Sequence, residues 1–169
     1  MMSLAERANT VRELFEQVDR LWDSYVGEVK KVLREWGRLR PLLAERLSVL
    51  RSRIASNLEE MQELNLKLEL GLVDEAKARR RLEELNAETP KLVRELEELW
   101  VLTERITRDS ILHMKRAGIP VDISEEDVVS KEREAEECFK ASVISRETFE
   151  RLKEILAEQL AALKPLSPD

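Results

Sequence analysis

The sequence feature that most constrains the fold is a regular apolar pattern near the start of the chain. Between residues 11 and 43, apolar side chains recur at alternating spacings of four and three residues. They are Val11, Phe15, Val18, Trp22, Tyr25, Val29, Val32, Trp36, Leu39 and Leu43. The mean spacing of about 3.5 residues is that of coiled coils, whereas a free helix repeats at roughly 3.6. The pattern therefore predicts a long helix with one narrow apolar stripe.

The composition is also that of long helices. Charged residues make up 38% of the 169 residues, and only four glycines and five prolines are present. A narrow stripe leaves most helix positions in water, which accounts for the high charge, and the Arg-rich, Glu-rich balance is typical of thermophile proteins. We expect an all-α fold: a single elongated helical domain over residues 1–169, built as a hairpin or bundle with coiled-coil character. It should have two long helices and about three shorter ones, with a long-helix part at 3–70 and a shorter-helix part at 74–164.

The first helix should start near Ser3, which forms a capping box with Glu6 three residues later. Its end is open to two interpretations. The segment from Gly37 to Pro41 can form a tight turn, with Pro41 as the first residue of a second helix that runs to about residue 70. Alternatively, the helix kinks there and continues, because the apolar pattern stays in phase through Leu43. We expect a turn or a sharp kink rather than a gentle bend.

Further boundaries follow from capping residues. Gly71 should end the second helix and Asp74 should cap a short one that runs to residue 85. Residues 86–89 break the pattern, and Thr89-Pro90 predicts a new start for a helix over residues 90–117, which Gly118 ends. Two more helices are expected, over residues 125–141 after Ser124 and over residues 146–163 after Ser145.

No motif in the sequence indicates chemistry. His113 is the only histidine and Cys138 the only cysteine, so neither a zinc site nor an internal disulfide has the residues it needs. Phosphate-binding glycine loops are absent. We therefore expect no enzyme activity, no catalytic residue, no cofactor and no metal. No uncharged run exceeds five residues, so we expect a cytoplasmic protein with no transmembrane segment.

Four residues of the apolar pattern are predicted to mediate association between chains: Phe15, Trp22, Val29 and Trp36. Their rings and branches are large for a seam between only two helices, which favours a wider bundle or a contact between copies. A narrow seam also buries little apolar surface per residue, so a homo-oligomer, preferably a dimer, should add stability. These considerations predict a non-enzymatic helical scaffold or interaction protein that acts through self-association and through protein partners.

An alternative function rests on a basic stretch within residues 30–53. Its candidate phosphate-binding residues are Lys30, Lys31, Arg34, Arg38, Arg40, Arg46, Arg51 and Arg53. Such a row can neutralise the backbone of a nucleic acid. Interleaved acidic residues and a net charge of −6 weigh against this function. The same row can instead face solvent, or meet the acidic segment 124–137 within the molecule or in a partner.

Two corners of the chain share one plan. Each has a small residue, two aliphatic residues, a helix-capping residue and a charged helix start, at residues 71–75 and 142–146. With the helix start Asp74-Glu75-Ala76-Lys77-Ala78-Arg79, this plan resembles the coiled-coil region of archaeal CdvA cell-division proteins over roughly residues 54–160. CdvA proteins carry a β-barrel where this chain begins with a predicted helix. The resemblance implies a self-assembling scaffold that works with ESCRT-III-like partners in cell division or cytoskeletal assembly.

Overall fold

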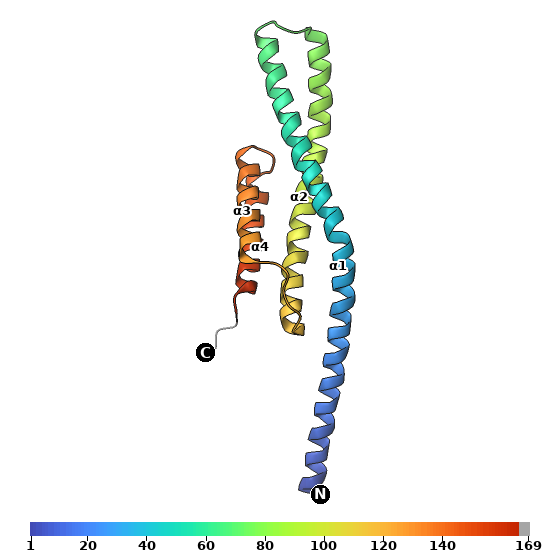
Figure 1. The fold of residues 1–169 in the computed structure, drawn as a ribbon. Helices are drawn as coiled ribbons and strands as arrows, with labels where there is room; N and C mark the ends of the chain where they lie inside the picture. The colour runs from blue at the N-terminus through green and yellow to red at the C-terminus, as the bar shows by residue number, and fades with distance from the viewer. Residues whose placement is uncertain (166–169) are drawn as a thin grey trace.

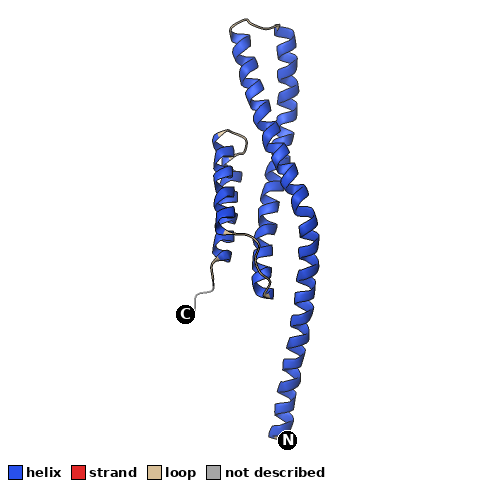
Figure 2. Cartoon of the chain, in the orientation of Figure 1, coloured by secondary structure: helices blue, strands red, loops and turns tan. Residues whose placement is uncertain are grey.

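The computed structural model describes residues 1–165, and these residues form four helices and no strand (Figures 1 and 2). The helices are α1 (Leu4–Glu69), α2 (Glu75–Ala117), α3 (Glu125–Lys140) and α4 (Arg146–Leu163). α1 and α2 form a long antiparallel hairpin, and a short hairpin of α3 and α4 lies beside α2 (Figure 1). The predicted all-α fold is confirmed and two of the helices are long, but they are not the two expected. α1 spans both predicted long helices, and α2 spans two of the predicted shorter ones, so two shorter helices follow rather than about three.

α1 does not turn at Pro41. The helix is continuous over 66 residues with Pro41 inside it, so the turn predicted between Gly37 and Pro41 is wrong and the continuing helix is correct. Proline inside a helix costs about 3 kcal/mol. Trp36 and Leu47 are both buried, one on each side of Pro41, and each contributes about 2 kcal/mol. Packing on both sides of the proline therefore outweighs the hydrogen bond that it removes.

α2 likewise continues through the predicted break at residues 86–89, with Pro90 inside it. Leu85 and Leu92 are buried on either side of this segment, so the helix is supported before and after the proline. Thr89 does not cap a helix start as predicted. It is buried, and its hydroxyl oxygen accepts a hydrogen bond from the side-chain amide of Asn57 in α1, at 3.2 Å.

The predicted caps at the remaining ends are confirmed. Ser3 with Glu6 and Ser124 with Asp127 form reciprocal capping boxes at the starts of α1 and α3. Asp74 and Ser145 accept backbone hydrogen bonds at the starts of α2 and α4. Gly71 and Gly118 adopt φ angles of 66° and 72° after α1 and α2, a conformation that costs glycine little. The cap at Gly118 fixes where α2 stops, and so how much of α1 it covers.

The core lies where the middle of α1, the middle of α2 and the α3–α4 hairpin meet. Its main cluster comprises Leu47, Leu50, Ile54, Leu92, Leu96, Trp100, Val101, Ala135, Val143, Ile144, Leu152 and Ile155. A second cluster, with Ile111, Val128 and Leu156 at its centre, joins α2 to both short helices. All α1 residues in these clusters lie after residue 46, so the first third of α1 takes no part in the core.

A buried polar cluster ties α2, α3 and α4 together. Glu104 of α2 is 4% exposed and pairs with Lys131 of α3 at 3.0 Å. The side-chain amide of Gln159 in α4 is fully buried and donates to both the carboxylate and the backbone oxygen of Glu104, each at 2.8 Å. A buried carboxylate is costly unless it is paired, and these contacts provide the pairing.

The corner between α3 and α4 is tied to α2 by Glu97. Its carboxylate accepts hydrogen bonds from the backbone amide and the hydroxyl of Ser145, at 3.0 and 2.7 Å. Burial opposes the charged form of this carboxyl group, but the hydrogen bonds from Thr148 and Ser145 outweigh burial and lower the pKa of Glu97. The stability that these hydrogen bonds contribute is therefore fully present at a pH above the ordinary carboxyl pKa. It is lost as the pH falls through the lowered pKa of Glu97.

Candidate functional site

The most unusual surface of the molecule is the first part of α1. Every residue from 4 to 24 is exposed, and in Figure 1 this segment, which we call the arm, extends alone past the end of α2. It is about 30 Å long. Its exposed large apolar residues are Leu4, Val11, Leu14, Phe15, Val18, Leu21 and Trp22. Phe15 is 66% exposed and Trp22 is 47% exposed, so half of the residues predicted to mediate association lie on a bare surface.

The arm is bare because α2 ends too early to cover it. The last contacts between the two helices are made near Tyr25 of α1 and His113 of α2. The Tyr25 hydroxyl is 2.7 Å from His113 Nδ1, and the two rings lie 5.9 Å apart. Four residues after His113, α2 stops at Ala117, before the left-handed Gly118. Toward the N-terminus, the apolar pattern of α1 therefore continues with no other helix of residues 1–165 opposite it.

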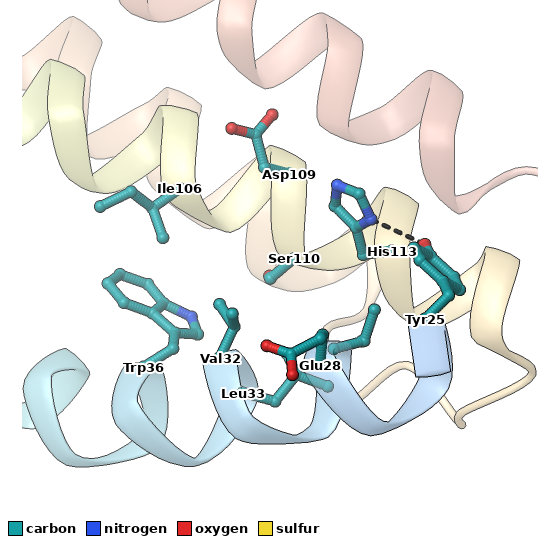
Figure 3. Close-up of a pocket in the computed structure, with 10 residues that line it drawn as sticks. Tyr25, Glu28, Val32, Leu33, Trp36, Ile106, Asp109, Ser110 and His113 are labelled. Carbon is teal, nitrogen blue, oxygen red and sulfur yellow. Dashed lines mark hydrogen bonds between the residues drawn. The ribbon is translucent and has the colours of Figure 1, made fainter. Parts of the chain in front are cut away.

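The other two predicted association residues lie inside the molecule. Val29 and Trp36 are each 7% exposed and face α2. They line a pocket of about 400 Å³ between the two helices, together with Ile106, Ser110 and His113 of α2 (Figure 3). Val29 and Trp36 thus pack within the chain, and the exposed part of the predicted surface consists of Phe15, Trp22 and their neighbours on the arm.

The pocket is mainly apolar, with acidic groups beside it. Glu28 of α1 and Asp109 of α2 are among its lining residues, and Trp36 and Ile106 face each other across it (Figure 3). The Trp36 indole Nε1 is buried and has no hydrogen-bond partner among residues 1–165. A space of this kind can accept an apolar side chain next to the base of the arm.

Most of the basic stretch is neutralised within the chain. Lys31 and Arg38 pair with glutamates one turn away on α1, at 3.0 and 2.7 Å. Four arginines reach other parts of the molecule: Arg40 pairs with Asp122, Arg46 with Glu95, Arg51 with Glu134 and Arg53 with Glu88. The pair between Arg51 and Glu134 joins the basic stretch to the acidic helix α3, as one of the sequence hypotheses predicts. These pairs leave little of the row free to bind phosphates.

Cys138 and His113 each contact other side chains of the chain. Cys138 packs against the main core cluster near Phe139, and burial raises the pKa of its thiol, which lowers the fraction of reactive thiolate. His113 is half-buried and bonds only to Tyr25 among the described residues. Within residues 1–165, no group of three or more His, Cys, Asp or Glu side chains is placed to hold a metal, and no helix is both long and apolar enough to cross a membrane.

Sequence reasoning missed two parts of this site. Leu14 and Leu21 lie seven residues apart, each one residue before an aromatic residue of the apolar pattern, and they widen the bare surface. That spacing is visible in the sequence. The pocket and the contact between Tyr25 and His113 join residues 88 positions apart, and no local signal predicts them. No protein-family model matches the chain, and neither a curated protein nor a solved structure is detectably similar to it.

Proposed function

We propose that this protein is a non-enzymatic helical scaffold that associates with itself through the arm of α1. The observation that carries the proposal is the bare apolar row from Val11 to Trp22, on a part of α1 that no other segment of residues 1–165 covers. Contiguous apolar surface on this scale is rare on soluble monomers and typically marks an interaction site. The heptad spacing of the row suits pairing with another helix.

The separation of the chain into a folded core and an exposed arm supports the same function. The core and the buried polar cluster lie after residue 46, and they give the helices a folded base that does not require the arm. A lone helical segment of about 20 residues gains little stability in water, because most helical stability comes from packing. Pairing of two arms would supply that packing. The arm is therefore best explained as the part of the molecule that is completed by association.

The corners that resemble those of CdvA proteins support a scaffold in the class of cell-division or cytoskeletal proteins. Both corners lie at helix joins: Gly71 follows α1, and Ser142, which adopts a φ angle of 63°, follows α3. They stand at the far ends of the two hairpins, away from the arm (Figure 1). In this proposal the arm joins copies of the chain, and the hairpins remain available to protein partners.

The direct test is the mass of the full chain in solution. Light scattering coupled to size exclusion, over a hundredfold range of concentration, should show a dimer that dissociates on dilution or a stable dimer throughout. Burial of the arm's apolar row in two copies supplies the driving force. A monomer of 19.7 kDa at every concentration would overturn the proposal.

A further inference from the structure

The geometry points to a second copy of this chain, running antiparallel, as the occupant of the arm, with the centre of the pair between Phe15 and Val18. This inference rests on the proposed self-association and adds the orientation and register of the two copies. Three features of the arm carry it: the sizes of the apolar residues, the signs of the flanking charges, and the position of the pocket. All of these residues belong to α1 or to the segment of α2 that faces it.

Residue sizes along the row favour the antiparallel pair. With its centre between Phe15 and Val18, each copy sets an aromatic ring opposite a smaller side chain in the layers formed by exposed residues of the arm. These layers are Phe15 with Val18 and Trp22 with Val11. A parallel pair in register would stack Phe15 on Phe15 and Trp22 on Trp22, with valine layers between them. Its layers would alternate between crowded and loose, whereas interfaces pack best at even density.

The flanking charges change sign along the arm. At the positions beside the apolar row, the first half carries Arg7 and Arg12, and the second half carries Asp19 and Glu28. All four are exposed. An antiparallel pair lays the basic half of one copy along the acidic half of the other, where opposite charges attract. A parallel pair would instead bring Arg7 of one copy toward Arg12 of the other.

The pocket lies where each end of the pair would fall. In this register, Leu4 of the second copy is level with Val29 of the first, which lines the pocket between α1 and α2. Leu4 is itself 80% exposed in the single chain. Because α2 covers Val29, Leu4 of the second copy would enter the pocket from its open side rather than lie opposite Val29 on the row. A leucine side chain suits this mainly apolar space. The pocket and the bare arm are then two parts of one interface.

The antiparallel orientation of the two copies can be tested by reversing the charges at positions 12 and 19. In an antiparallel pair, Arg12→Glu places an acidic side chain beside the acidic Asp19 of the other copy, and Asp19→Arg places a basic side chain beside the basic Arg12 of the other copy. Each variant alone should therefore dimerise about tenfold more weakly than the unaltered chain, as measured by sedimentation at low salt. An equimolar mixture of the two variants should recover the original affinity, because only the mixed pair brings opposite charges together.

Arg20→Glu is the matched control, since it makes the same charge change on the face of α1 opposite the row, and it should leave dimerisation unchanged. Arg12→Glu also removes an exposed contact with Glu16 at 3.4 Å, which the mixed pair does not restore. In a parallel pair, Arg12→Glu would meet Arg7 and strengthen the dimer, and mixing would bring no recovery. That result would overturn the antiparallel register while leaving self-association intact. A chain that is monomeric before any substitution would overturn both.

Discussion

Replacing Trp22 with glutamate should convert the dimer into a monomer at concentrations where the unaltered chain is fully paired. Trp22 is half exposed on the arm, and its ring is tilted against that of Tyr25 at a centroid distance of 5.7 Å, so its substitution removes little from the fold of the single chain. In the pair, the Trp22 side chain of each copy would be buried, so the substitution removes two buried side chains. Losing about 2 kcal/mol of apolar burial at each copy raises the dissociation constant about 1000-fold.

The matched control for this variant is Gln17→Glu, which adds the same charge on the same arm but away from the apolar row. Its dissociation constant should stay within a factor of about three of the original. Circular dichroism of both variants, at a concentration low enough that both are monomeric, should show the same helix content for the whole chain. An unchanged mass for Trp22→Glu, measured by light scattering, would remove the arm as the interface.

Replacing Glu104 with alanine should destabilise the fold by about 3 kcal/mol without weakening self-association per folded chain. The substitution leaves Lys131 without its partner and deprives the fully buried amide of Gln159 of the carboxylate it donates to. Breaking a buried pair by removing one member is strongly destabilising. At the usual scaling for a chain of this length, the melting temperature should fall by about 6–12 °C.

Glu98→Ala is the control for this prediction, because Glu98 is exposed on the same helix and its loss should cost less than about 0.5 kcal/mol. Removing both partners with Glu104→Leu and Lys131→Met should recover part of the loss, since an apolar pair needs no compensation for buried charge. If thermal unfolding of Glu104→Ala matches that of Glu98→Ala, then the polar cluster does not hold α3 and α4 onto α2.

Local sequence signals predicted the ends of the helices well and their continuity poorly. Capping residues act on the backbone beside them, so Ser3, Asp74 and Gly118 could be assigned from the sequence alone. Pro41 and Pro90 carry an equally local signal against helix. It is overruled by buried side chains on both sides of each proline, whose partners lie on the other helix. Those partners cannot be identified from the spacing of one stripe.

In the candidate site, too, the sequence predicts the local pattern but not the partner against which it packs. One uniform apolar pattern runs through Phe15, Trp22, Val29 and Trp36, yet the first two are exposed and the last two are buried within the chain. The difference arises from where α2 ends, and a heptad pattern is the same whether its partner helix belongs to the same chain or to another. The sequence did not predict that Glu104 is buried and paired, for a similar reason. A single glutamate in a charged helix is expected to face solvent.

Pairing of the arm, which is the central claim, is tested most directly by hydrogen–deuterium exchange resolved along the chain at two protein concentrations, one well above and one well below the dissociation constant. If two arms pair, the amides of residues 4–24 should exchange more slowly at the high concentration, because their helix is then covered on one face. Amides of the core helices after residue 46 should exchange equally at both. Exchange of residues 4–24 that does not depend on concentration would contradict the account.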